Sequence, residues 1–227
     1  MERIQGTQSN QYIITLTIKE YLDINSQLPE ETIDQLLNLI YEYEETSLSK
    51  PNLVARLREI LGDAKESLIN SDSDIVGQIR AISNLQTYVK GFDKICLILD
   101  RDYSSFKEYQ YDKVLEICKD YKFSLGISNP NFEFYLLLHL TDGKSLDHGK
   151  VKNNPNITRK KKYVEFELNR EMKKLTTAYR KNKYDAELLI KRFSDLKENV
   201  AGYATDNLKL KNEIGTSVHY IIEEILN

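Results

Sequence analysis

The chain has 227 residues, of which 41% are hydrophobic and 30% are charged, a composition that indicates a soluble globular chain rather than a disordered one. The formal net charge of -3 at pH 7 does not mark a nucleic-acid-binding protein, so the distribution of charge matters more than its sum. No stretch approaches the roughly 18 apolar residues of a membrane span, and no signal peptide pattern is present. Cys96 and Cys118 lie in apolar runs, so we expect reduced core residues in a cytoplasmic protein.

The N-terminal part of the chain is predicted to be mainly helical, because its apolar residues recur at helical spacing. Residues 30–45 are ambiguous, since Leu39, Tyr41 and Tyr43 also alternate with polar residues as in a strand. We predict a helix there, followed by a short strand near residues 39–43. The other predicted elements are a very short strand over 1–5 and helices over 10–22, 52–69 and 74–89.

The pattern changes at residue 94. Residues 95–99 form an unbroken apolar run, which is typical of a central strand buried on both faces of a parallel sheet. A helix over 108–121, a second strand over 123–127 and a helix over 131–140 are predicted to follow. This alternation of strand and helix predicts an α/β fold with a parallel sheet. Further helices are predicted over 162–179, 185–203 and 216–226.

Asp100 and Asp102 directly follow the first apolar run. Ligands of open α/β sheets bind beyond the carboxyl ends of the strands, and residues two apart on an extended chain point to the same side. Two neighbouring carboxylates repel each other unless a cation bridges them, and Mg²⁺ with water and phosphate is the usual solution. The alternative is that Asp102 only caps the next helix.

Glu133 is the only acid in the helix predicted over 131–140, which is apolar nearly all round. A lone buried carboxylate is costly, so it needs a partner. A metal ion shared with Asp100 and Asp102 is one such partner, and a salt bridge to a lysine is the other.

After residue 142 the sequence becomes polar and basic, and residues 143–162 are predicted to form a mobile loop. A second basic run over 179–184 has tyrosines beside its cations. Basic residues with neighbouring aromatic rings suit a phosphodiester backbone and stacked bases, although a solvated surface is an equally good interpretation of 160–162. The candidate nucleic-acid-binding residues are Lys150, Lys152, Arg159, Lys160, Lys161, Lys162 and Arg180.

These residues together resemble the RloB-like proteins, which are Toprim-fold proteins of bacterial anti-phage systems and include the second component of the AbiL abortive-infection pair. The most specific part is the block Ser128-Asn129-Pro130-x-Phe132-Glu133-x-Tyr135-Leu136-Leu137-Leu138-His139, after the Asp-x-Asp pair. The run Tyr179-Arg180-Lys181 and the closing segment 215–225 are also similar to the family pattern.

The resemblance implies a Toprim-like α/β core with a small parallel sheet flanked by helices, and a helical C-terminal part. We expect a core over 1–142 with a helical insertion near 24–91, a basic loop over 143–162, and a helical part over 163–227 packed on the core. The resemblance also implies Mg²⁺- or Mn²⁺-dependent cleavage of RNA, such as tRNA, or of DNA. A partner ATPase of the ABC/SMC-like kind, encoded alongside, would control this activity.

In this interpretation Asp100, Asp102 and Glu133 bind the metal and Lys181 stabilises the charged phosphate. The family pattern at the first turn resembles Glu-Gly-x-x-Thr-Glu, but here Gln5 and Asn10 occupy the two acid positions. Gln5 can offer an oxygen to a metal but cannot act as a general base at neutral pH. On the basis of Asp100, Asp102, Glu133 and the basic segments, we predict a metal-dependent nuclease. The alternatives are a catalytically weakened pseudo-nuclease that binds nucleic acid or a partner, and a scaffold whose acids make only salt bridges.

Overall fold

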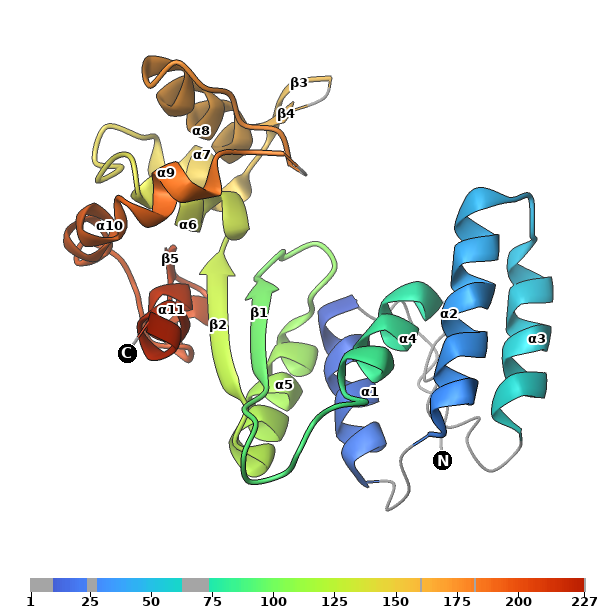
Figure 1. The fold of residues 1–227 in the computed structure, drawn as a ribbon. Coiled ribbons are helices and arrows are strands. Elements are labelled where there is room, and N and C mark those ends of the chain that lie inside the picture. The colour runs from blue at the N-terminus through green and yellow to red at the C-terminus, as the bar shows by residue number, and fades with distance from the viewer. Residues whose placement is uncertain (1–9, 24–27, 63–73, 160, 182, 227) are drawn as a thin grey trace. The chain divides into compact units, whose positions relative to one another are not determined.

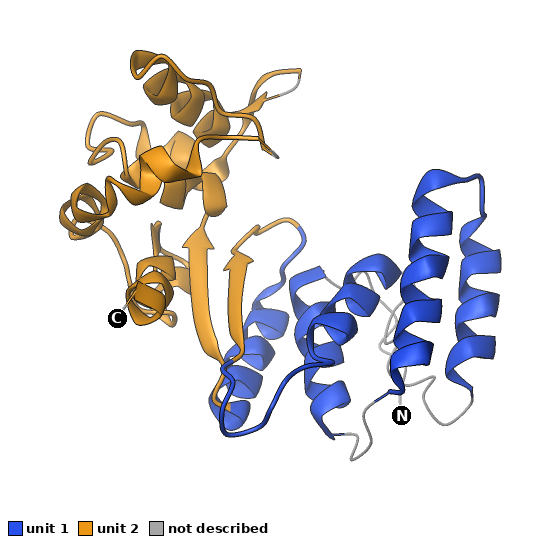
Figure 2. Ribbon diagram, viewed as in Figure 1, with its two compact units in different colours: residues 1–94, 105–121 blue, residues 95–104, 122–227 orange. Residues whose placement is uncertain are grey.

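The computed structural model describes residues 10–23, 28–62, 74–159, 161–181 and 183–226 (Figure 1). The chain divides into two compact units (Figure 2). The first comprises residues 1–94 and 105–121, and the second comprises residues 95–104 and 122–227. No helix of the described residues is long and apolar enough to cross a membrane.

The first unit is helical and buries the apolar faces of its helices against one another. Helix α1 packs against α4 and α5, and α2 packs against α3 and α4. A hydrogen bond of 3.2 Å from the buried Thr17 hydroxyl to Gln78 Oε1 joins α1 to α4. Helix α3 begins after Ser49, whose side chain accepts the Asn52 N–H, and ends at Gly62, which has a φ of +66°. The helices are α1 (Asn10–Asp23), α2 (Glu30–Glu45), α3 (Lys50–Leu61), α4 (Ile75–Asn84) and α5 (Glu108–Tyr121).

The short strand predicted near residues 39–43 is wrong, because α2 continues through them to Glu45. Leu39 and Ile40 are buried beside Ile33 and Leu36, whereas Tyr41 is 68% exposed. Burial therefore follows the helical spacing, and the local alternation has no structural counterpart. The predicted helices over 10–22 and 108–121 are confirmed. The strand predicted over 1–5 lies outside the described residues.

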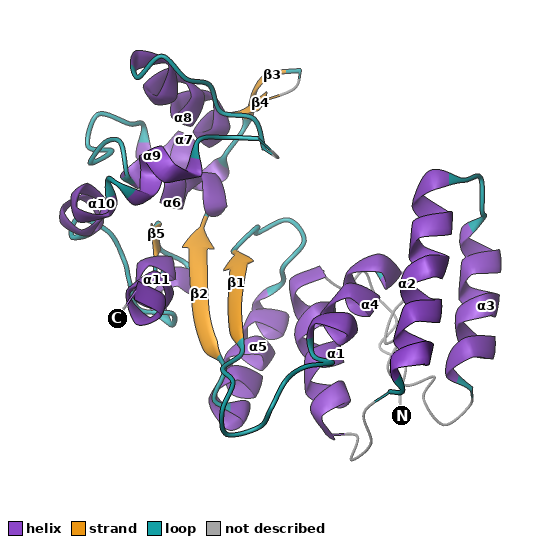
Figure 3. Cartoon of the chain, viewed as in Figure 1, coloured by secondary structure: helices purple, strands orange, loops and turns teal. Residues whose placement is uncertain are grey.

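The second unit contains a small mixed sheet in the order β1–β2–β5 (Figure 3). Strands β1 (Cys96–Asp100) and β2 (Ser124–Asn129) are parallel, and β5 (Gly215–Thr216) is antiparallel to β2. The predicted α/β class is confirmed, but the described sheet is not wholly parallel. Within the described sheet β1 lies at an edge, and Ile98 is 43% exposed, so the described residues do not bury this strand on both faces as predicted. Cys96 is exposed as well, whereas Cys118 is buried as expected.

The helices of the second unit surround the apolar α6 (Phe132–Leu138), which packs against α8 and α10. All residues from Glu133 to Leu138 are buried. The C-terminal part is helical, as expected, although the single helix predicted over 185–203 is divided into two. The remaining elements are α7 (His148–Asn153), β3 (Asn156–Thr158), β4 (Lys161–Lys162), α8 (Tyr163–Lys174), α9 (Ala186–Ile190), α10 (Phe193–Val200), a 3₁₀ turn (Lys209–Lys211) and α11 (Val218–Leu226).

Residues 143–162, expected to be a mobile loop, contain α7 and the β3–β4 hairpin. Asp147 caps α7 by accepting the Lys150 N–H at 3.0 Å, and Val151 is buried in the core of the unit. The basic segment is therefore held to the second unit by apolar contacts, which its lysine-rich composition did not indicate. The compact units also follow different boundaries from the predicted domains, because residues 143–227 belong to the same unit as β1 and β2.

Helix α11 lies so close to β2 at Gly126 that an added side chain would meet it at very short distances. A Cβ at this position would lie 3.1 Å from Val218 Cα and 3.0 Å from Ile221 Cδ1. We expect Gly126→Ala to lower the free energy of unfolding by about 1–3 kcal/mol, because the helix must move away from the strand. Urea unfolding measures this loss. Gly202→Ala is the matched control, since its added Cβ would meet no atom within 4 Å, and equal midpoints for the two variants would contradict the prediction.

Candidate functional site

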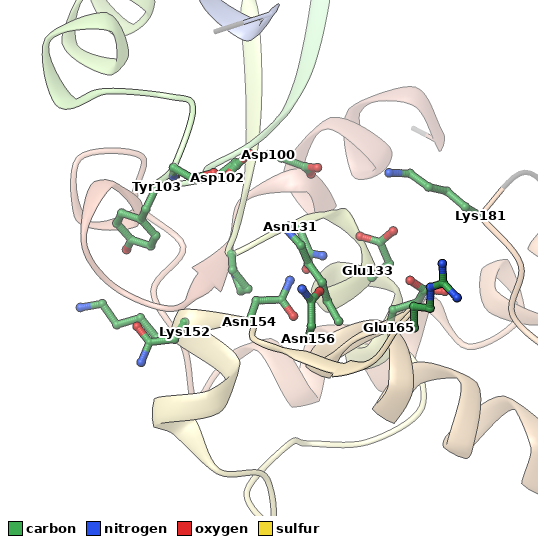
Figure 4. A pocket seen from close by; sticks show the side chains of 15 residues that line it. Asp100, Asp102, Tyr103, Asn131, Glu133, Lys152, Asn154, Asn156, Glu165 and Lys181 are labelled. Atoms are coloured by element: carbon green, nitrogen blue, oxygen red, sulfur yellow. Dashed lines mark hydrogen bonds between the residues drawn. The ribbon is translucent and has the colours of Figure 1, made fainter.

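A pocket of about 880 Å³ lies at the carboxyl ends of β1 and β2, within the second unit (Figure 4). This is where ligands of open α/β sheets bind. The pocket combines acidic and basic side chains in equal number. The acidic ones are Asp100, Asp102, Glu133 and Glu165, and the basic ones are Lys152, Arg159, Lys162 and Lys181.

The chain segment after β2 brings Glu133 to the same place as Asp100. Asp100 ends β1 opposite Ser128 of β2, and its Oδ1 accepts the N–H of Phe132 at 2.7 Å. The Ser128 hydroxyl donates to the carbonyl oxygen of Asn131 at 2.7 Å, which holds the connecting turn. Because Glu133 is the next residue in α6, the two carboxylates face a shared space (Figure 4).

Asp100 and Glu133 are electrostatically coupled. Burial, followed by the negative charge of Glu133, raises the pKa of Asp100 to about 6, against smaller opposing effects of the Phe132 N–H and the Lys181 ammonium. Glu133 is only 7% exposed, and its Oε1 accepts the Tyr179 hydroxyl at 3.0 Å. Burial and the Glu133 charge raise the pKa of Tyr179, so this hydroxyl stays protonated and keeps donating.

Asp102 lines the pocket but has a different environment. Its Oδ1 accepts two hydrogen bonds from Ser104, from the N–H at 3.1 Å and from the hydroxyl at 2.6 Å. These bonds close a turn several residues before α5 begins at Glu108, so the alternative that Asp102 caps the next helix is wrong. The turn fixes one carboxylate oxygen at the rim of the pocket.

In the described part of the chain, no three Asp, Glu, His or Cys side chains form a group that could hold a metal ion as they stand. A divalent cation would relieve the repulsion between Asp100 and Glu133. Mg²⁺ is commonly bound through one or two carboxylates, with water and substrate phosphate as further ligands. A pair of carboxylates beside Asp102 fits this requirement.

The pocket includes about half of the residues predicted to bind phosphate. Lys181 is an exposed residue in a turn, and its amine points toward Asp100 and Glu133 (Figure 4). Lys152, Arg159 and Lys162 also line the pocket, whereas Lys150, Lys161 and Arg180 do not. Lys150 pairs with Asp147 and Lys161 pairs with Glu165, each at 3.7 Å.

The remaining predicted site residues are not in the pocket of the described structure. Gln5 and Lys160 lie outside the described residues, and Asn10 is the first residue of α1 in the first unit.

Several pocket residues were missed by the sequence analysis. Glu165 reaches the pocket from the first turn of α8, and no local pattern distinguishes it from the other glutamates of that helix. Arg101 does not itself line the pocket, but it is only 1% exposed and its guanidinium carbon lies 4.3 Å from the ring centre of the pocket residue Tyr103. Its position between two aspartates at the end of a strand is a signal that could have identified it. Four asparagines also line the pocket, namely Asn131, Asn153, Asn154 and Asn156.

The family model described as RloB-like protein matches residues 14–225. The chain belongs to the RloB-like protein family. The match covers nearly all of both compact units and confirms the family resemblance that Asp100, Asp102 and the Ser128–Glu133 block indicated. No match was found among curated proteins or among solved structures. The pocket of this RloB-like protein lies entirely within the matched residues.

Proposed function

We propose that this RloB-like protein is a Toprim-type, metal-dependent nuclease. The observation that carries the proposal is the carboxylate pair of the partly buried Asp100 and the buried Glu133, at the ends of β1 and β2, in one pocket with four cationic side chains. Carboxylates that bind a divalent cation, next to lysine and arginine side chains that bind phosphate, are the combination that phosphodiester hydrolysis requires. The resemblance to the RloB-like family supports a role in a cytoplasmic abortive-infection system, under the control of a partner ATPase.

All the charged side chains of the pocket except Glu165, which pairs with Lys161, have a role in this proposal. Asp100, Asp102 and Glu133 would hold Mg²⁺ or Mn²⁺, which supplies Lewis-acid stabilisation of the phosphate and a water of lowered pKa. The Tyr179 hydroxyl orients Glu133 through the bond to Oε1. Lys181 offsets the negative charge that develops on the phosphate. The remaining pocket cations, Lys152, Arg159 and Lys162, neutralise the neighbouring phosphates of the strand.

The proposal is tested by incubating the purified chain with tRNA, other RNA, and single- and double-stranded DNA. We expect cleavage of at least one substrate in Mg²⁺ or Mn²⁺ and none in EDTA. Loss of cleavage in the Asp100→Asn variant, purified in the same way, separates this activity from a contaminating nuclease. Intact substrates with both metals would contradict the proposal.

The neighbouring residues Lys181 and Arg180 allow a matched comparison, because only Lys181 lines the pocket. We expect Lys181→Ala to lower the cleavage rate about 10- to 1,000-fold, since it removes a cation that faces the acidic pair. Arg180→Ala changes the same net charge in the same segment and should stay within about threefold of the unaltered protein. Single-turnover cleavage rates measure both effects. Equal losses in the two variants would indicate a general charge effect instead of a catalytic role for Lys181.

A second candidate function is a pseudo-nuclease that binds nucleic acid or a partner without cutting. It is favoured by the amides Gln5 and Asn10 and by the lack of a three-carboxylate group among the described residues. Under this hypothesis the unaltered chain binds but does not cleave, and Gln5→Glu restores cleavage. Robust cutting by the unaltered chain excludes it.

A further inference from the structure

Tyr103 forms part of the pocket wall and is held there from two directions. Its hydroxyl accepts a hydrogen bond from Asn129 Nδ2 at 2.7 Å, and the Arg101 guanidinium carbon lies 4.3 Å from the centre of its ring. Arg101 is itself anchored, because its Nε donates to the Lys211 carbonyl oxygen at 2.8 Å. The amine of Lys152 lies 5.9 Å from the same ring centre. The ring is therefore a preformed surface beside cationic groups.

Asn131 has an unsatisfied hydrogen-bond acceptor in the same pocket. Its Oδ1 is buried and has no hydrogen-bond partner in the described part of the chain. Asn131 occupies the N-cap position of α6, yet its side chain makes no capping hydrogen bond. A buried acceptor without a partner is unfavourable, and a ligand N–H or O–H placed in the pocket would satisfy it.

We propose that Tyr103 and Asn131 form a subsite for one unpaired nucleoside beside Asp100 and Glu133. The base stacks on the Tyr103 ring, and an N–H of the base or an O–H of the ribose donates to Asn131 Oδ1. This inference rests on the proposed function, because it takes the acidic pair as the place of cleavage. It specifies the substrate class as single-stranded nucleic acid, or an unpaired segment of a folded one.

The arrangement of the pocket supports an unpaired strand. Stacking on a protein ring requires a base that has left its own stack, which an intact duplex does not offer. Tyr103 and Lys152 lie on one side of Asn131 and Lys181 lies on the other (Figure 4). A strand that crosses the pocket would thus place a nucleoside on Tyr103 and the adjoining phosphate near Asp100. A volume of about 880 Å³ is within the range of pockets that enclose a small ligand.

The subsite is tested by fluorescence anisotropy in EDTA, so that binding is measured without cleavage. The probes are labelled single-stranded RNA, single-stranded DNA of the same sequence, and the corresponding DNA duplex. We expect tighter binding of both single strands than of the duplex. Tyr103→Leu should weaken single-strand binding about 5- to 100-fold, the range for loss of one base–aromatic stack, and should change duplex binding less than about twofold.

Two variants provide the controls. Tyr103→Phe keeps the ring and should bind single strands as the unaltered chain does, whereas Tyr220→Leu removes a tyrosine that is 52% exposed and outside the pocket. Thermal unfolding of each variant reports whether it is folded. Asn131→Ala should weaken binding, and a loss confined to RNA would identify the ribose 2′-hydroxyl as the donor. A loss for both single strands would identify the base.

Unchanged single-strand binding in Tyr103→Leu, equal losses in Tyr103→Leu and Tyr103→Phe, or no binding of any probe would overturn the subsite. A cleavage assay in Mn²⁺ tests the proposed nuclease independently of the subsite. An unaltered chain that cuts single and double strands equally, with Tyr103→Leu equally active, keeps the nuclease and rejects the subsite. A chain that binds single strands through Tyr103 but cuts nothing keeps the subsite and rejects the nuclease.

Discussion

Asp100→Asn is expected to abolish metal-dependent cleavage, with a fall in rate of at least about a thousandfold. The variant removes the negative charge that, with Glu133, would bind the cation, and contributions of metal ions to catalysis amount to several kcal/mol. The amide is nearly the same size as the carboxylate and can still accept the Phe132 N–H, so the local fold should be kept. Single-turnover cleavage in Mg²⁺ and Mn²⁺ measures the effect.

Asp195→Asn is a suitable control for this experiment. Asp195 lies in the same compact unit but outside the pocket, in an exposed pair with Arg192. The same chemical change should therefore leave the cleavage rate within about twofold. Cleavage by Asp100→Asn at the rate of the unaltered chain would reject the proposed nuclease mechanism.

The same Asp100→Asn substitution is expected to stabilise the protein when metal is absent. The pKa of Asp100 is raised from its ordinary 3.8 to about 6 in the folded chain, chiefly by burial and then by the charge of Glu133. A raised pKa in the folded state means that this carboxyl contributes most stability below pH 4. That contribution is lost as the pH rises through about 6. At pH 8 the ionised Asp100 carboxylate therefore lowers the free energy of unfolding by about 3 kcal/mol, compared with its protonated form at low pH.

An asparagine is neutral at every pH and avoids this cost. In EDTA at pH 8 we expect Asp100→Asn to unfold at a higher temperature than the unaltered chain, and we expect the difference to shrink toward zero at pH 4. Adding Mg²⁺ at pH 8 should raise the unfolding temperature of the unaltered chain, because the cation binds the folded state, and should have little effect on the variant. Differential scanning calorimetry at the two pH values measures both changes. A less stable variant at pH 8 in EDTA would show that Asp100 is not an electrostatically unfavourable carboxylate.

The two expected results have one physical origin. A carboxylate that is buried next to another one destabilises the empty fold and, for the same reason, favours a bound cation. Activity and stability should therefore change in opposite directions on substitution of Asp100. A residue with only a structural role would lose both together.

Much of the acidic site could be predicted from local patterns. An apolar run that ends in Asp100 and Asp102 predicted acids at the carboxyl end of a strand, and a helix with a single acid predicted a functional Glu133. The structure has both elements, with Asp100 and Glu133 in the same pocket. The helices over 10–22 and 108–121 were equally predictable, because their spacing of apolar residues is a property of consecutive residues.

Other features depend on residues far apart in the chain. The alternation at Leu39 and Tyr41 suggested a strand, but the burial of Leu39 against neighbouring helices kept α2 helical. Val151 holds a segment whose charge indicated a loop, and Glu165 reaches the pocket from a helix without distinguishing pattern. Neither position has a local signal, because each depends on which face of one element packs against another.

The amino-acid sequence by itself determined the family, the α/β class, most helices and the acids at the strand ends. These follow from short-range periodicity and from one specific block of residues. Only the tertiary structure decided which cations join the acids, that Tyr179 donates to Glu133, and that Arg101 and Asn129 hold Tyr103 at the pocket wall. The physical reason is that a pocket forms where separate elements pack around the buried helix α6, and the geometry of that packing is not contained in any single segment.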